Sequence, residues 1–206
     1  MALQNRVTPF GELVAVPQHG AFMGNRGGRF HDPDTRTLGS RRWASKRWIC
    51  CRLTFKERHR KVWGNGYTEL FFHDEASALA AGHRPCFECR RHDAIAFGEA
   101  VKRAFGLDTR PGADWLDARL HAERLTDIDT RTSVNPESRL PDGTVIASGG
   151  KPFVMRNGSA WPWIGFGWNE QPFDRELLGD IRLVTPPTVL GALDAGYRPL
   201  IVIGSA

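Results

Sequence analysis

The chain has 206 residues, among them 28 Lys and Arg and 23 Asp and Glu, and a formal net charge of +5 at pH 7. Its 41% hydrophobic and 25% charged residues are typical of a globular protein and exclude a disordered, collagen-like or coiled-coil chain. The sequence contains no apolar run long enough to span a membrane, and its opening lacks the pattern of a secretory leader. We therefore expect a cytoplasmic protein that does not contact the membrane.

Positive charge is concentrated between residues 25 and 61, which hold twelve Lys and Arg against three acids. The rest of the chain carries more acids than bases. Residues 1–46 are rich in Gly, Pro and Arg, and their glycines favour an irregular loop whose backbone approaches a ligand closely. We expect a basic Gly/Arg-rich N-terminal region over 1–46, with one short strand at 12–16.

Residues 47–125 are predicted to form two strands followed by three helices. The alternating, aromatic-rich segments 47–55 and 67–72 predict a β-hairpin, because a basic stretch ending in the turn pair Asn-Gly separates them. The two-residue period puts Cys51 and its alternate neighbours on one strand face, which we expect to face the core, and Cys50 on the other.

Three helices follow this hairpin in the prediction. Asp74 is a good N-cap for a short helix that Gly82 ends. A second helix begins at the following cysteines and runs to Phe105, and a third covers about 113–125. Residues 126–206 read as turns, short strands and one closing helix, which predicts a small, mainly antiparallel β domain. The expected fold class is α+β.

Four cysteines form two pairs, Cys50 with Cys51 and Cys86 with Cys89. In a reducing compartment this pattern favours metal or redox chemistry over structural disulfides. Two cysteines separated by two residues can present both sulfurs to one zinc ion, and a helix that starts beside them lowers their thiol pKa. The sequence therefore predicts a Zn²⁺ site that includes Cys86 and Cys89.

The adjacent pair complicates the rest of the ligand shell. Neighbouring strand residues point to opposite faces, so we expect either Cys50 or Cys51 as a ligand and the other as a buried apolar residue, unless a bulge breaks the strand. A histidine or water would then complete the shell. The preferred histidines are His121 and His73, and the next are His83 and His92.

The segment ELFFHDEASALAAGHRPCFECRR, residues 69–91, resembles the zinc-binding N-terminal domain of the Ada DNA-repair family. The resemblance covers about a tenth of the chain as a motif, and the chain as a whole is similar to bacterial proteins that share this segment. It implies an Ada-like zinc unit over 47–125 in which Cys86 and Cys89 match the family's second cysteine pair. In that family, one of four zinc-bound thiolates accepts a methyl group from a DNA phosphotriester. Here the first pair is adjacent, whereas the family separates its two cysteines by three residues.

The basic segment interleaves its cations with aromatic residues, a composition typical of nucleic-acid surfaces. We expect the chain to bind nucleic acid, DNA in preference to RNA, and to take part in the repair or processing of damaged or modified DNA. The candidate phosphate contacts are Arg26, Arg29, Arg41, Arg42, Lys46, Arg58 and Arg60.

Two other functions stay open at this point. A zinc-dependent or His/Asp-dependent hydrolase, nuclease or glycosylase could use His31 with Asp32, or His121 with Glu123, as acid–base groups. The chain completes no recognised hydrolase motif, and His31-Asp32 also suits an ordinary turn. The second alternative is a protein-interaction module, because arginine-rich loops also meet acidic protein partners.

Overall fold

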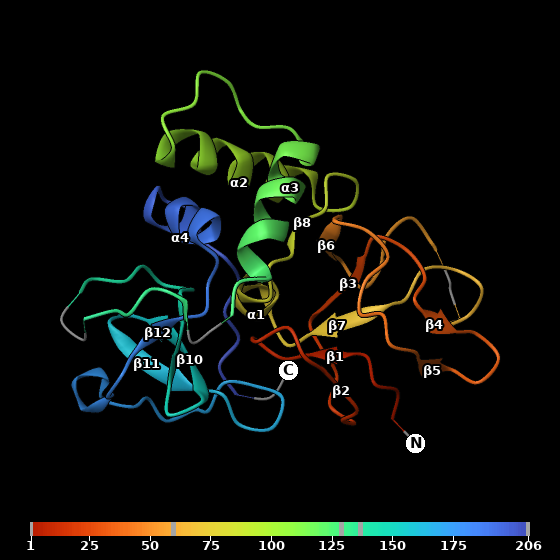
Figure 1. The fold of residues 1–206 in the computed structure, drawn as a ribbon, viewed down its shortest axis with the longest axis horizontal. Helices are drawn as coiled ribbons and strands as arrows, with labels where there is room; N and C mark the ends of the chain where they lie inside the picture. The colour runs from red at the N-terminus through yellow and green to blue at the C-terminus, as the bar shows by residue number, and fades with distance from the viewer. Residues whose placement is uncertain (1, 59–60, 128–129, 136–137, 205–206) are drawn as a thin grey trace.

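The computed structural model describes residues 2–58, 61–127, 130–135 and 138–204. It has a mixed α+β architecture in which two β-rich parts lie on either side of a group of helices (Figure 1). Within the described residues, no helix combines the length and the apolar character that a bilayer crossing requires.

The N-terminal part is built on a six-stranded sheet with the order β2-β1-β7-β3-β6-β8. The regions 1–46 and 47–125 both supply strands to it. Its strands are β1 (Arg6–Val7), β2 (Leu13–Val14), β3 (Phe22–Arg26), β6 (Trp48–Cys51), β7 (Leu70–Phe72) and β8 (Arg84–Pro85). A separate two-stranded ribbon joins β4 (His31–Asp32) to β5 (Thr37–Leu38).

The expected hairpin is wrong, because β3 lies between β6 and β7 and pairs antiparallel with both. Gly24 lets β3 occupy this central place. A Cβ atom there would lie 2.1 Å from the carbonyl oxygen of Ile49 and 2.7 Å from the ring of Phe72. The glycine-rich stretch that suggested a loop therefore contains the strand that joins the two predicted strands.

Four helices occur at the predicted places: α1 (Glu75–Ala80), α2 (Arg91–Ala104), α3 (Ala113–Arg124) and α4 (Pro187–Asp194). The Asp74 cap is confirmed, since its carboxylate accepts a hydrogen bond from the backbone N–H of Ser77 at 2.8 Å. The second helix starts later than expected, two residues after Cys89. One apolar core joins α2, α3 and α4 through side chains that include Phe97, Leu116 and Leu193.

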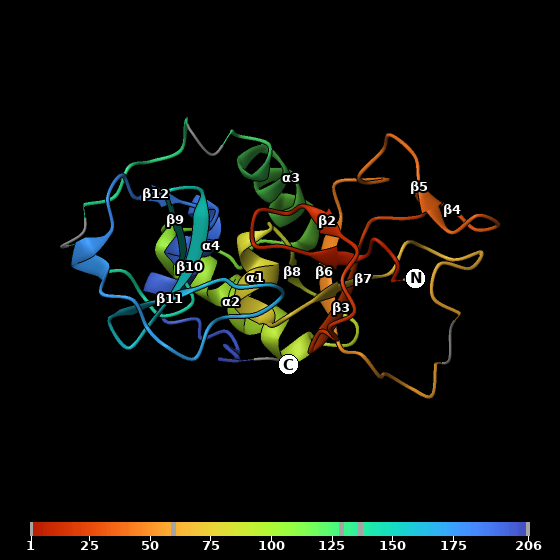
Figure 2. The ribbon, with the colours of Figure 1, turned by 90° about the horizontal axis from the view of Figure 1, so that it is seen from below.

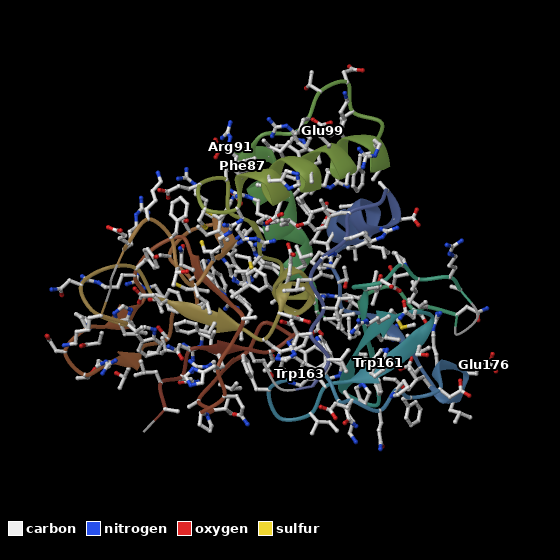
Figure 3. The ribbon with its side chains drawn as sticks, turned by 180° about the vertical axis from the view of Figure 1, so that it is seen from behind. Phe87, Arg91, Glu99, Trp161, Trp163 and Glu176 are labelled. Carbon is white, nitrogen blue, oxygen red and sulfur yellow. The ribbon has the colours of Figure 1, made fainter. Side chains whose placement is uncertain are left out.

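The C-terminal part is an antiparallel sheet with the order β11-β10-β9-β12, as the sequence predicted. Its strands are β9 (Val145–Ser148), β10 (Lys151–Arg156), β11 (Ser159–Pro162) and β12 (Arg182–Leu183), and a 3-10 turn, η2 (Arg175–Leu177), precedes β12. Trp161 and Trp163 lie on the side of this sheet that approaches the N-terminal part (Figure 3). Both pack against the core that α1 shares with β9 and β10.

The short helix α1 lies between the two sheets (Figure 2). It contacts β6 and β7 on one side and β9 on the other, and all six of its residues are buried. The two β-rich parts are therefore joined through one buried helix.

Candidate metal centre

Three cysteine thiols meet at one edge of the N-terminal sheet. The Sγ atoms of Cys51, Cys86 and Cys89 all lie within 4.8 Å of one another, and all three residues are buried. Cys51 ends β6, and the other two occupy the turn between β8 and α2. Sulfurs from two stretches of chain that are distant in sequence are therefore placed as one group.

Strand pairing sets the positions of these thiols. β8 runs parallel to β6, and the backbone N–H of Cys86 donates to the carbonyl oxygen of Cys50 at 3.0 Å. The turn then closes on the first sulfur, because the N–H of Glu88 donates to the Sγ of Cys86 at 3.4 Å. The N–H of Arg90 donates to the Cys86 carbonyl at 3.0 Å, so the backbone is fixed on both sides of the turn.

Cys50 points to the opposite face of β6. It is fully buried in the core of the N-terminal sheet, where the Nη1 of Arg90 donates to its sulfur at 3.4 Å. Burial raises the pKa of the Cys50 thiol despite this cation, so the group stays protonated at neutral pH. The structure thus brings three of the four predicted ligands together and leaves Cys50 in the core.

The three clustered thiols interact strongly. Hydrogen bonds from Cys51 and Cys89, helped by backbone N–H groups of the turn, lower the pKa of Cys86 to about 2. The pKa of Cys51 is raised, because its proton is hydrogen-bonded to the other two sulfurs and it is buried. One thiolate is stabilised in this way, whereas ionising all three requires a cation that offsets their repulsion. Soft sulfur donors suit Zn²⁺ and similar soft ions.

A cavity of about 390 Å³ opens onto the cluster. All three clustered cysteines lie on its wall, together with apolar side chains of β3, β6 and β7. The polar members of the wall are Asn25, Arg52, Thr54, Arg58, Tyr67, Glu69 and Glu88. A metal ion held by the three sulfurs would therefore border a space large enough for a small molecule or a nucleotide base.

Two acids line this cavity in different ways. Glu69 is 3% exposed and accepts a hydrogen bond from the backbone N–H of Trp63 at 2.9 Å. Glu88 is exposed and forms an ion pair with Arg58, with an Nη2–Oε1 distance of 2.6 Å. The sequence prediction missed Glu69, although the two-residue period of the predicted strand 67–72 places it on the same face as Phe71.

The histidines expected as a fourth ligand lie elsewhere. His73 is hydrogen-bonded through Nε2 to the carbonyl of Val202 at 2.8 Å, and its ring meets the edge of Trp163. The Nδ1 of His121 lies 3.1 Å from the guanidinium of Arg124. Neither residue joins the three sulfurs in the part of the chain that the structure describes. Of the less preferred pair, His83 is buried beside Trp48 and His92 is 95% exposed.

The proposed acid–base pair His31 and Asp32 has structural partners. Both ring nitrogens of His31 are hydrogen-bonded, Nδ1 to the hydroxyl of Thr68 at 2.8 Å and Nε2 to the carbonyl of Gly64 at 2.9 Å. The exposed Asp32 accepts two backbone N–H bonds within its own turn, which lower its pKa. These contacts match the turn that the sequence offered as the simpler explanation.

The second proposed pair, His121 and Glu123, also makes structural contacts. The carboxylate of Glu123 accepts hydrogen bonds from the backbone N–H and the hydroxyl of Thr188, at 3.0 and 2.6 Å. It therefore joins the end of α3 to the start of α4. Neither His121 nor Glu123 lines the cavity beside the thiols.

The basic segment divides into exposed and buried cations. The ribbon of β4 and β5 lies at the end of the molecule farthest from the C-terminal sheet, whereas residues 41–46 lie beside the end of α3 (Figure 2). Arg26 is buried, and Arg60 falls outside the described residues. The exposed candidates for phosphate contact are Arg29, Arg41, Arg42, Lys46 and Arg58.

Comparisons with known proteins were made against family models, curated proteins and solved structures, and none of the three found a match to this chain. The observations on which a function can be built are therefore those of the chain itself. They comprise a buried group of three cysteines that could hold a metal ion, the cavity beside it, and the exposed cations.

Proposed function

We propose that this protein binds Zn²⁺ through Cys51, Cys86 and Cys89, binds nucleic acid, and takes part in repairing or processing damaged or modified DNA. The observation that carries the proposal is the convergence of three buried sulfurs on one point. A reducing cytoplasm, where we place the protein, would keep these thiols available to the metal.

The DNA part of the proposal is supported by charge and by the resemblance to Ada. Arg41, Arg42 and Lys46 are exposed in one stretch, and Arg52 and Arg58 line the cavity that borders the thiols. Arginine side chains match phosphate oxygens with two parallel hydrogen bonds, which favours a phosphate backbone as the partner. DNA is the partner that we propose, because the repair family with the similar cysteine motif acts on a DNA phosphotriester.

The zinc site is tested by comparing two adjacent cysteines. We expect purified wild-type protein to contain a stoichiometric amount of zinc by elemental analysis. Cys51→Ala should lose the metal, whereas Cys50→Ala should keep it, because the sulfur of Cys50 faces the core. Wild-type protein without metal, or equal loss from both variants, would contradict the proposal.

DNA binding is tested by fluorescence anisotropy with a labelled duplex at several salt concentrations. We expect affinity to fall steeply with salt, and the double variant Arg41→Ala/Lys46→Ala to reduce the log–log slope by about 0.9 for each phosphate that is no longer neutralised. Arg139→Ala removes an exposed cation from the C-terminal half and serves as the control. Affinity that does not depend on salt, or equal effects of the two changes, would refute the DNA proposal.

A hydrolase, nuclease or glycosylase is the second candidate, and the cavity beside the three cysteines favours it. Zinc held by three protein ligands supplies an activated water when bound. In this candidate Glu69, on the same cavity wall, is the general base. Glu69→Gln should then abolish strand cleavage or base release from an alkylated duplex while zinc content stays unchanged. If the wild-type protein neither cleaves the strand nor releases a base, this second candidate is refuted and only the proposed binding function remains.

A further inference from the structure

The buried Arg26 and the half-buried Arg124 stack on one tryptophan, on the side of β6 away from the thiols. The guanidinium carbons of Arg26 and Arg124 lie 3.9 and 4.0 Å from the ring centroid of Trp48. Arg26 comes from β3 and is 2% exposed, and Arg124 ends α3. Stacking on an indole favours cations, but it supplies no negative charge.

Arg26 donates only to uncharged acceptors. Its Nη2 bonds the carbonyl of Gly11 at 2.7 Å, its Nη1 the carbonyl of Arg42 at 3.3 Å, and its Nε the Nε2 of His83 at 3.4 Å. Buried charges in proteins are normally paired with a charge of opposite sign. Arg26 has no such partner among the ion pairs of the described residues.

Arg124 likewise forms no ion pair among the described residues. Its guanidinium bonds the carbonyls of Gly82 and Lys46, each at 2.7 Å, while its buried Nε has no hydrogen-bond partner in the described chain. The pKa values of Arg26 and Arg124 are lowered to about 9 each, chiefly by burial and, for Arg26, also by the nearby positive charges of Arg124 and Arg42. Both groups therefore stay cationic at neutral pH.

These two arginines lie on the wall of a pocket of about 410 Å³. Arg42 and Arg131 line it as well, and Glu12 is the one acid among the described residues of its wall. The negative charges of three acids that are not among the wall residues also act on these cations, Asp117 on Arg124, and Asp127 and Glu123 on Arg131. The indoles of Trp43 and Trp48 complete the wall, and Trp43 is 37% exposed.

We propose that this pocket binds the phosphate group of a nucleotide, with the base stacked on Trp43. Four guanidinium groups against one wall carboxylate give the pocket a positive potential. Arginine forks bind phosphate oxygens, and an exposed indole provides a stacking surface for a base. The inference depends neither on the metal centre nor on binding of a duplex.

The nucleotide could be free in solution, or it could be the 5′-terminal nucleotide of a nucleic acid. The probes that separate these sources are inorganic phosphate, AMP, and a single-stranded oligonucleotide with or without a 5′-phosphate. Calorimetric titration of the full chain with each probe measures the affinities directly. Tighter binding of AMP than of inorganic phosphate indicates the free nucleotide. A preference for the 5′-phosphorylated oligonucleotide over AMP indicates the chain end.

Arg42→Glu is the test variant, because it inverts a charge on the pocket wall and keeps the carbonyl that Arg26 uses. It should weaken phosphate and nucleotide binding by about tenfold or more, since it removes a charge-assisted hydrogen bond and adds repulsion. Arg91→Glu inverts an exposed charge on α2, outside the pocket, and should leave these affinities unchanged (Figure 3).

A second variant tests the stacking wall without altering charge. Trp43→Ala should reduce the affinity for the nucleotide probe to that for inorganic phosphate. Wild-type protein that binds none of the probes would overturn the proposal. So would binding of inorganic phosphate alone, equal effects of the two Arg→Glu changes, or an unchanged preference in Trp43→Ala.

Discussion

His83 is a neutral side chain held among cations and aromatic rings. Its Nε2 accepts a hydrogen bond from Arg26 at 3.4 Å, and its ring lies 4.9 Å from Trp48 and 4.6 Å from Phe72. Burial lowers its pKa well below the usual 6.5, and the charges of Arg26 and Arg124 lower it further. The folded protein therefore resists protonation at this site.

This shift makes folding stability depend on pH. Below about pH 6.5 the unfolded chain binds a proton at His83 that the folded chain does not bind, so stability falls by up to about 1.4 kcal/mol per pH unit. Above that pH the contribution is fully present. His83→Gln keeps an acceptor for Arg26, and it should make the loss of stability between pH 7.5 and 5.5 smaller than in the wild type.

Urea unfolding at the two pH values measures this difference. His92→Gln changes a histidine that is 95% exposed, and it should leave the pH dependence as in the wild type. If His83→Gln and wild type lost the same stability on acidification, the buried neutral state of His83 would be disproved.

At the scale of elements, a buried ion pair joins β8 to α3. Both Arg84 Nε–Asp117 Oδ1 and Arg84 Nη2–Asp117 Oδ2 measure 2.8 Å, and the two side chains are 4% and 6% exposed. The two parallel hydrogen bonds fix the strand that leads directly into Cys86. Breaking the pair from one side leaves a buried cation without compensation.

Asp117→Asn should therefore lower the free energy of unfolding by about 3 kcal/mol. Asp114→Asn is the same change on the same helix, but its side chain is 94% exposed and lies 3.8 Å from Arg47. It should barely alter stability, because exposed pairs contribute little. Equal unfolding midpoints for the two variants in urea would contradict this account.

The sequence predicted the helices well and the strand neighbours poorly. A helix is recognised from contacts within a few residues, so Asp74, Gly82 and the apolar stripes were sufficient. The place of β3 between β6 and β7 depends on long-range pairing. Its need for Gly24 becomes visible only when the neighbouring backbones are present.

The candidate site was predictable in part for the same reason. Alternation along a strand separates Cys50 from Cys51, as the structure shows, but it does not tell which face holds the core. Both faces are in fact buried. Cys50 faces the core of the N-terminal sheet, and Cys51 lies in a smaller apolar cluster, where Ile49 and Phe55 pack against the three thiols beside the cavity. The expectation that the Cys51 face is a core face therefore holds in part. The strand ends at Cys51, and of the two residues expected to continue that face, Leu53 is exposed and Phe55 is half-buried. The sequence did not predict a binding role for Arg124, because the residues that line its pocket come from segments far apart in the chain.

At the scale of the whole molecule, α1 and the C-terminal segment hold the two β-rich parts together. The Oδ2 of Asp74 accepts hydrogen bonds from the indole of Trp168 at 2.8 Å and from the N–H of Val202 at 3.1 Å. Glu75 accepts from Arg90 at 2.7 Å and from the hydroxyl of Tyr197 at 2.6 Å. The first residues of one short helix are thus bonded to the C-terminal segments and, through Arg90, to the turn that precedes α2.

Because of these bonds, we expect the two parts to unfold together. Trp168→Phe removes the indole donor from the buried Asp74, and it should destabilise the protein by about 2 kcal/mol. Native-state hydrogen exchange should show reduced protection in peptides from both β3 and β10. Loss of protection confined to β10 would show that the two parts open independently.

The three sulfurs are positioned by β6, β8 and the turn that follows, and none of them belongs to the stretch between β6 and β7. That stretch leaves the sheet after Cys51, supplies much of the cavity wall, and returns at Leu70. Substitutions at its exposed positions can therefore alter the cavity while the strands that position the three sulfurs stay unchanged. Selection can adjust what enters the cavity separately from the positions of the three sulfurs.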